Sequence, residues 1–334
     1  MRNKGLLLTL SVIVLIIFII ADILIGSVSI PIKDFFAYFS GTEIKPEFQT
    51  IITEFRIPKM ITALLAGLAL SIAGLQMQTI FRNPLAGPYV LGISSGASLG
   101  VALLLLSPLP FLLASSSGMS WLTSIFAWFG AGLVLILIFI VSIRVKDVMT
   151  ILIIGVLFGS AVSAFVSILQ YFGDQAQLKT FVVWTMGSLS GVTNEQLFVL
   201  LPSVIVGLLI SIFSVRKLNI LLLGENYAKS SGLNLTGARI LIFTSTGILA
   251  GSVTAFCGPI GFIGIIVPHI ARMLFQTADH RILIPASAII GAILLLISDI
   301  ISQLPTYSGT LPINSITAIL GIPIVIYIII KNKI

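Results

Sequence analysis

About ten apolar stretches, most of them close to 20 residues long, follow one another along this chain with short polar connections between them. An α-helix needs such a run to cross the hydrocarbon core of a bilayer, because each residue advances it by only about 1.5 Å. Hydrophobic residues make up 57% of the 334 residues and charged residues 9%, against roughly 25% charged in a soluble domain. The sequence therefore predicts an all-α polytopic membrane protein, with residues 1–334 forming a single transmembrane domain.

We expect the spans at Leu6–Ile25, Lys59–Ile80, Val90–Ser107, Trp121–Ile143, Val148–Phe172, Leu197–Val215, Ala238–Phe256, Ile260–Phe275, Ile282–Ile301 and Ile313–Ile330. This even number returns the chain to the side on which it began. Of the 18 Lys and Arg residues, five (Lys33, Lys45, Arg56, Lys59 and Lys179) fall on the far side and the other 13 on the side of the termini. Basic residues accumulate on the cytoplasmic side of membrane proteins, so both termini are predicted to be cytoplasmic. The net charge of +7 is then a topology signal and requires no nucleic-acid partner.

The stretch Gly258–Arg281, GPIGFIGIIVPHIARMLFQTADHR, is apolar enough to enter the bilayer but is interrupted by several Gly and Pro residues. Backbone at such breaks needs protein or a water-filled cavity around it, and interrupted spans mark the working parts of many transporters. The alternative is an ordinary kinked span followed by a basic loop. The charge distribution favours a crossing, because otherwise the basic residues that follow would fall on the wrong side.

Residues 31–57 carry acidic side chains and short amphipathic pieces such as DFFAYF, which predict an extracellular surface cap. At its end, RIPK places Arg56 and Lys59 at the mouth of the second span. Basic side chains in such a position snorkel to the interface, or they form a docking point for an acidic partner. Asp299 lies near the same outer end of its span, where a structural ion pair is favoured over a proton site.

Two helical faces carry small or polar residues at helical spacing. Gly67, Ser71, Gly74 and Gln78 share one face of the second span, which predicts close packing of another helix. The fifth span carries Ser160, Ser163, Ser167 and Gln170 on one face. These groups either bond to neighbouring helices or line a polar path.

The longest cytoplasmic connection, residues 217–238, alternates short apolar runs with polar residues and is punctuated by Gly224, Gly232 and Gly237. This pattern predicts two short helices lying across the cytoplasmic face. Such a partly apolar surface suits a soluble partner, and a simple connector is the alternative.

The sequence lacks the residues that several other classes of protein function require. No GxxxxGK[ST] motif occurs, so the chain is not expected to bind nucleotide through a P-loop. Cys257 is the one cysteine, and the two histidines, His269 and His280, lie near the inner surface rather than inside the bundle; a haem-linked oxidoreductase is therefore poorly supported. An ion-driven carrier needs acidic groups at mid-membrane, and the candidates Asp22 and Asp299 both lie near span ends. No catalytic residue and no metal site is predicted.

Four segments are highly specific, and they occur in the same order as in a known family. They are RIPKMITALLAGLALSIAGLQMQTIFRNPLAGPYVLGISSGASLG (56–100), LLLGENYAKSSGLNLTGAR (221–239), GPIGFIGIIVPHIARML (258–274), and TADHRILIPASAIIGAILLLISDI with LPINSITAILGIPIVIYIII (277–330). With them the chain resembles the FecCD/BtuC-type permeases of bacterial ABC importers for iron-siderophores, haem and vitamin B12.

The resemblance implies a type II importer fold in the cytoplasmic membrane, with a second permease copy or paralogue, two ATPase subunits that bind ATP and Mg²⁺, and an extracellular substrate-binding protein. No cofactor is expected in this chain itself. The resemblance assigns ATPase coupling to Gly224, Glu225, Ala228, Ser231, Gly232, Pro268, His269 and Arg272. It assigns binding-protein docking to Arg56 and Lys59, and it favours the Ser160–Gln170 face as a translocation path. The family's third basic docking position is Gln303 here, which removes one charged contact.

The leading hypothesis is therefore import of an iron(III)-siderophore complex, driven by a separate ATPase and without catalysis by this chain. Haem and cobalamin remain alternatives within the family. An ion-gradient-driven secondary transporter is the alternative from another class.

Overall fold

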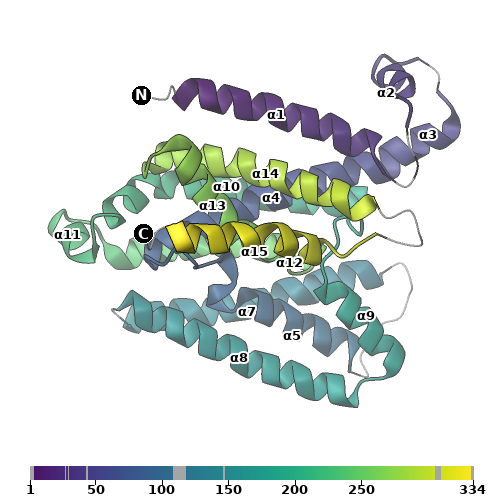
Figure 1. The fold of residues 1–334 in the computed structure, drawn as a ribbon. Helices are drawn as coiled ribbons and strands as arrows, with labels where there is room; N and C mark the ends of the chain where they lie inside the picture. The colour runs from purple at the N-terminus through teal and green to yellow at the C-terminus, as the bar shows by residue number, and fades with distance from the viewer. Residues whose placement is uncertain are drawn as a thin grey trace.

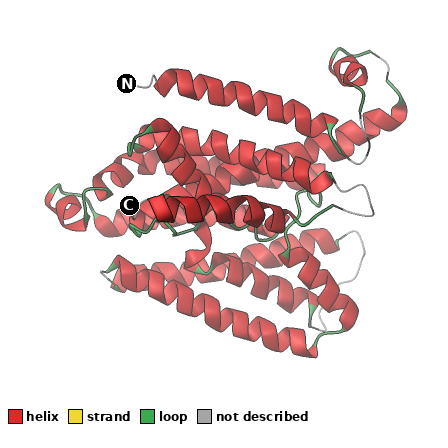
Figure 2. Cartoon of the chain, viewed as in Figure 1, coloured by secondary structure: helices red, strands yellow, loops and turns green. Residues whose placement is uncertain are grey.

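The computed structural model describes residues 4–26, 28, 30–42, 44–107, 118–145, 147–304 and 310–331. Figure 2 shows that the described chain consists of helices and loops, and no described residue belongs to a β-strand. The α-helices are α1 (Lys4–Leu24), α2 (Ile32–Phe39), α3 (Pro46–Thr50), α4 (Ile57–Ile80), α5 (Ile93–Leu105), α7 (Met119–Arg144), α8 (Val148–Phe172), α9 (Gln175–Thr185), α10 (Asn194–Leu221), α11 (Glu225–Ser230), α12 (Leu235–Cys257), α13 (Ile263–Phe275), α14 (His280–Gln303) and α15 (Ile313–Lys331).

The long helices run side by side, and the short ones lie at the two ends of the bundle (Figure 1). One end carries α11, together with the start of α1 and the end of α15, and we call it the α11 end. The other carries α2, α3 and α9, and we call it the α2 end. Seven of the described helices are long and apolar enough to cross a membrane. The return of the chain to the α11 end agrees with the predicted even number of spans.

Helix α4 is the centre of the bundle. It packs against α10, α12, α13 and α14, and most of its residues are buried. Its polar side chains are therefore paired within the protein: Gln76 donates from Nε2 to Ser245 Oγ (3.1 Å) and accepts at Oε1 from Thr246 Oγ1 (2.9 Å). By contrast, α1 and α8 lie at the periphery with mostly exposed apolar side chains.

Glycines set how closely α4 approaches its neighbours. A Cβ atom at Gly67 would overlap the backbone of Gly291 on α14, and one at Gly74 would overlap the backbone of Gly264 on α13. Such contacts stabilise helix pairs in membranes, where the hydrophobic effect between helices is absent. The close packing predicted for this face of the second span is confirmed.

The interrupted segment crosses from one end of the bundle to the other. Helix α12 ends at Cys257 at the α2 end, where the Cys257 carbonyl accepts from Ser188 N (2.8 Å). Gly258 and Phe262 have φ values of +71° and +66°, and α13 then provides only 13 residues. Backbone N–H groups at the break that lack a helical partner donate to side chains, Ile260 N to Tyr89 Oη (3.2 Å) and Gly261 N to Asn314 Oδ1 (2.9 Å). Irregular backbone at this depth is thus enclosed in protein, as the sequence predicted.

Each predicted span corresponds to a helix, but two connections differ from expectation. Helix α10 continues to Leu221 and α12 begins at Leu235, so the predicted loop 217–238 contains one short helix, α11, and not two. At the α2 end, α3, a π-helical turn (Ile51–Arg56) and α4 follow without interruption. The last part of the predicted cap is therefore an extension of the central helix.

Candidate functional site

The α11 segment is a short helix held in a sharp turn between α10 and α12. It starts after Gly224, whose φ of +111° is open mainly to glycine, and a Cβ atom there would also meet the guanidinium group of Arg82. Arg82 Nη2 in turn donates to Leu221 O at the end of α10 (3.2 Å). At the other end Gly232, with φ +81°, closes the helix as Leu233 N donates to Ala228 O (2.9 Å).

An ion pair fastens α11 to the body of the protein. Arg239 Nη2 lies 2.6 Å from Glu225 Oε1, and Arg239 Nη1 donates to Val145 O (3.3 Å) after α7. The Arg239 side chain is almost completely buried, whereas Glu225 is about one third exposed. Breaking such a pair leaves a buried charge uncompensated, which is more costly than losing a surface pair. The pair therefore connects α11 to α12 and, through the Val145 carbonyl, to the end of α7.

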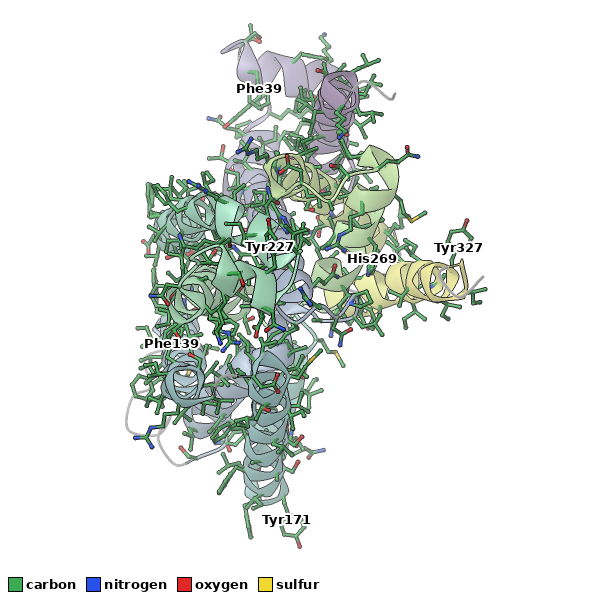
Figure 3. The ribbon with its side chains drawn as sticks, turned by 90° about the vertical axis from the view of Figure 1, so that its left-hand side faces the viewer. Phe39, Phe139, Tyr171, Tyr227, His269 and Tyr327 are labelled. Atoms are coloured by element: carbon green, nitrogen blue, oxygen red, sulfur yellow. The ribbon has the colours of Figure 1, made fainter. Side chains whose placement is uncertain are left out.

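The residues predicted for ATPase coupling divide into two groups. Glu225, Ser231 and Gly232 are partly or fully exposed, whereas Gly224 and Ala228 are buried and support the turn. Sequence reasoning missed the most exposed apolar side chains of this segment, Leu223 and Tyr227. Figure 3, viewed from the α11 end, shows Tyr227 facing the viewer. The sequence did contain a signal for this exposed surface, because the apolar run LLL (221–223) directly precedes the turn at Gly224.

The predicted residues of α13 lie at the same end but are engaged internally. His269 Nε2 is 2.7 Å from Pro84 O, and Arg272 Nη1 donates to Gln78 Oε1 (2.6 Å). Pro268 and His269 are buried. These contacts hold the loop after α4 against α13. In the monomer, therefore, α13 supports the α11 end from within, and its role in coupling remains a prediction.

A polar cluster missed by the sequence reasoning joins α10, α4 and α14 next to α11. Asn219 Nδ2 donates to Asp279 Oδ1 (2.7 Å), while Asn219 Oδ1 accepts from His280 N (2.9 Å) and lies 2.7 Å from His280 Nδ1. His280 Nε2 lies 2.8 Å from Thr79 Oγ1. The Arg281 backbone N–H and the Asn219 amide hold the pKa of Asp279 below its ordinary value. Nothing in the sequence around Asn219 marks it, because its partners are about 60 residues away.

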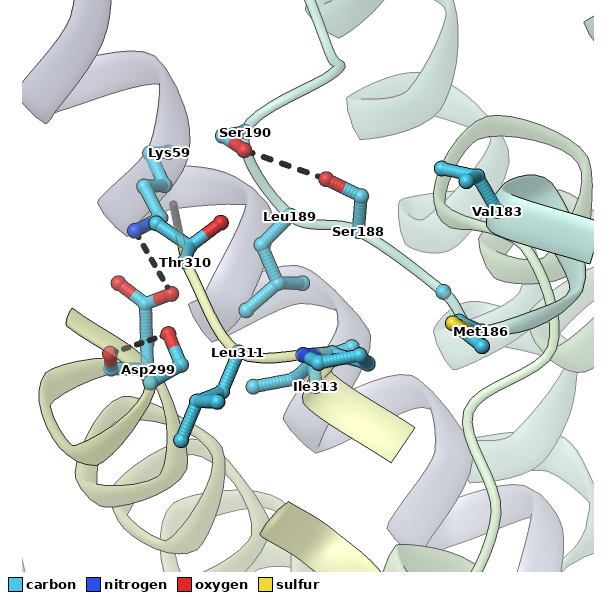
Figure 4. Close-up of a pocket in the computed structure, with 13 residues that line it drawn as sticks. Lys59, Val183, Met186, Ser188, Leu189, Ser190, Asp299, Thr310, Leu311 and Ile313 are labelled. Carbon is cyan, nitrogen blue, oxygen red and sulfur yellow. Dashed lines mark hydrogen bonds and ion pairs between the residues drawn. The ribbon is translucent and has the colours of Figure 1, made fainter. Parts of the chain in front are cut away.

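The α2 end carries an ionic cluster that includes both predicted docking residues. Lys59 Nζ lies 2.9 Å from Asp299 Oδ1, and Gln303 Nε2 donates to Asp299 Oδ2 (2.7 Å). Figure 4 shows this pair in the wall of a cavity of about 240 Å³, which Ser188, Ser190 and Thr310 also line. The structural pairing favoured for Asp299 from the sequence is present here, and Lys59 is its partner.

Arg56 is buried beside this cavity, with 6% of its surface exposed. Its guanidinium group donates to Ile25 O (2.5 Å), Val28 O (3.1 Å) and Gln303 Oε1 (2.6 Å). It therefore caps the end of α1 and links it to α14. Docking by Arg56 and Lys59 remains a prediction, and both residues would have to exchange internal partners to take part in it.

The predicted polar face of α8 points away from the bundle. Ser160, Ser163 and Ser167 are exposed and Gln170 is half-buried. Each of the three hydroxyls donates to a carbonyl of its own helix, at 2.9–3.0 Å. They form no bridge to another helix of this chain among the described residues, and the translocation path along this face remains a prediction.

Comparison with known proteins gives consistent results. The model of the FecCD transport family matches residues 14–331. The hemin transport system permease protein of Yersinia pestis is 37% identical, over 83% of this chain and 82% of its own length. A vitamin B12 import system permease protein of Escherichia coli is 35% identical, over 87% of both chains.

A solved structure described as an inward-facing conformation of a metal-chelate type ABC transporter has a TM-score of 0.82 at 31% identity, covering 98% of this chain and 99% of that chain. The membrane-sized helices, the return of the chain to the α11 end and the match over nearly the full length agree with one another. The chain therefore belongs to the FecCD transport family and is a permease subunit of an ABC importer of the metal-chelate, haem or vitamin B12 type.

Proposed function

We propose that this permease carries an iron(III)-siderophore complex across the cytoplasmic membrane along a path that it forms with a second permease chain. The observation that carries the proposal is the exposed hydroxyl face of α8. Ser160, Ser163 and Ser167 lie on a membrane-sized helix that is otherwise rich in exposed apolar side chains. Each hydroxyl is satisfied within its own helix, but three on one face are better placed against protein or water than against lipid tails. This face is therefore expected to border a path shared with a second copy or a paralogue.

The energy for transport is proposed to come from two separate ATPase subunits bound at the α11 end. Leu223 and Tyr227 offer exposed apolar contacts there, and the buried Arg239 connects the same segment to α7 and α12. Movement of α11 would therefore be passed to long helices and not absorbed by a flexible loop. ATP and Mg²⁺ would bind to the partner, and this chain would convert the movement into a shift between outward-open and inward-open states.

Delivery of the cargo is proposed to occur at the α2 end, which would then be extracellular and both termini cytoplasmic. A carboxylate of the binding protein would compete with Asp299 for Lys59, whose side chain is 12% exposed at the cavity. Arg56 is less accessible, so we expect Lys59 to make the first contact. The cavity beside the pair gives an acidic side chain room to enter.

The proposal is tested by uptake into sealed vesicles that contain the permease with its ATPase and binding protein. We expect ATP-dependent accumulation of an iron(III)-siderophore, and competition by other siderophores rather than by haem or cobalamin. Preferred uptake of haem or cobalamin would support an ATP-driven importer but contradict the siderophore as its cargo. Uptake that persists without the ATPase and collapses with the ion gradient would instead support a secondary transporter and contradict the proposal.

A further inference from the structure

Helix α2 has an orientation unlike that of the spans. Figure 1 shows α1 running across the view and α2 seen nearly end-on beside the end of α1, so the two helices are roughly perpendicular. The axis of α2 therefore lies close to the plane of the bilayer, at the level where the spans end. In Figure 3, which looks along the bundle, Phe39 lies at the margin of the molecule next to α1.

The rotation of α2 about its axis is set by its contacts with the protein. Phe35 is buried at 6% exposure, and Tyr38 Oη lies 3.1 Å from Thr53 Oγ1 in the π-helical turn before α4. These two contacts hold one face of the helix inward. Because the rotation of α2 about its axis is fixed in this way, its remaining faces have a defined orientation.

An exposed face of α2, about a quarter turn from the buried one, is apolar. Ile32, Phe36 and Phe39 are exposed by 64%, 61% and 60%, and their spacing of i, i+4 and i+7 places them on one stripe of the helix. Contiguous apolar surface of this kind marks an interaction site and not ordinary solvent exposure. Lys33 is exposed next to the stripe, where its long side chain can reach the headgroups while its stem lies along the apolar surface.

The stripe follows the exposed apolar surface of a membrane-sized helix, α1. Helix α1 has only a small buried fraction, and its exposed side chains include Ile13, Ile16 and Ile17. Val28, between α1 and α2, is 44% exposed. Exposed apolar side chains thus follow one another along the chain from α1 to α2, and no residue of the stripe lines the cavity at Lys59 and Asp299.

From these observations we propose that α2 is an interfacial helix that inserts Ile32, Phe36 and Phe39 into the lipid leaflet at the α2 end. Short amphipathic helices with Phe and Leu-type residues on one face and a basic residue beside it bind lipid surfaces in this manner. The anchored helix would hold the π-helical turn, and with it Arg56, at a fixed depth in the membrane. The proposal holds for whichever leaflet this end faces and does not depend on the cargo.

The test measures the depth of α2 in the full-length protein in nanodiscs of phosphatidylcholine and phosphatidylglycerol. In a Cys257→Ala background, which removes the one cysteine of the chain, Phe36→Cys and, separately, Phe39→Cys are labelled with an environment-sensitive fluorophore. Glu47→Cys on α3, also exposed, is the matched control. Quenching by nitroxide-labelled lipid is compared with quenching by aqueous iodide.

We expect lipid quenching to be several-fold stronger at positions 36 and 39 than at 47, and iodide quenching to follow the opposite order. Equal behaviour at all three positions would overturn the proposal by placing α2 in water. Protection of positions 36 and 39 from both quenchers would also overturn it, because it would place the stripe against protein. A loss of transport with the expected quenching pattern would concern the proposed function and leave this inference intact.

Discussion

At the scale of the residue, Asn219 connects α10 to the start of α14. Its amide donates to Asp279, so its oxygen must face His280, where it accepts from the backbone N–H and from Nδ1 of the ring. Asn219→Ala should therefore leave buried donors of His280 without a partner, at a cost of about 1–3 kcal/mol. We expect a thermal unfolding midpoint a few degrees lower in detergent.

The matched control is Asn226→Ala on α11, which makes the same chemical change at an exposed position. It should change the free energy of unfolding by no more than about 0.5 kcal/mol, so the unfolding midpoint should stay close to that of the wild type. Equal effects of the two substitutions would show that the cluster around Asn219 is not what holds these helices together.

Single residues of this kind were the least predictable part of the protein. Gln76, Asn219 and Arg239 each form buried polar contacts, yet none stands out in its local pattern. A polar residue in an apolar sequence signals that a partner exists, but not which one. The identity of the partner depends on how distant helices are packed, and periodicity along one helix does not contain that information.

At the scale of the element, hydropathy predicted the spans well because the bilayer imposes their length and composition. It failed where an element is defined by its neighbours. Helices α10 and α12 extend beyond the apolar runs, and this leaves room for only the one helix α11. The π-helical turn before α4 has no periodic signature, and the unbroken passage from cap to central helix was therefore missed.

The pairing of α4 with α13 depends on the absence of a single methyl group. A Cβ atom at Gly74 would overlap the backbone of Gly264, which cannot rotate away as a side chain can. Gly74→Ala should force the helices apart and destabilise the protein by about 1–3 kcal/mol. Monodisperse yield and unfolding midpoint are the measurements.

Gly132→Ala on α7 serves as the comparison, because a Cβ atom there would have no neighbour within 4 Å. It should be neutral or slightly stabilising, since alanine is the better helix former. If both variants behaved alike, the effect would come from helix propensity and not from the close approach of α4 to α13.

At the scale of the whole molecule, the α11 end and the α2 end are joined by α4, α12 and α14. The sequence predicted this two-ended arrangement, because 13 of the 18 basic residues fall on the side of the termini and the family motifs lie at both ends of the spans. It did not predict that the cations at the α2 end are engaged inside the chain. Arg56 caps α1, and Lys59 pairs with Asp299. At Lys59 the proposed docking role would therefore coincide with a structural one, and a test of docking has to separate binding from stability.

Two variants achieve this separation. Lys59→Met leaves Asp299, whose side chain is 2% exposed, without its cation, and breaking a buried pair from one side costs about 3–5 kcal/mol. Adding Asp299→Asn removes the orphaned charge while keeping an acceptor for Gln303, so the double variant should recover most of the lost stability. It would still lack the basic group at the cavity. We therefore expect the double variant to insert and fold normally but to bind the extracellular binding protein at least about tenfold more weakly, which corresponds to 1.4 kcal/mol. Unchanged affinity in a stable double variant would contradict docking through Lys59 and restrict the residue to holding α4 against α14.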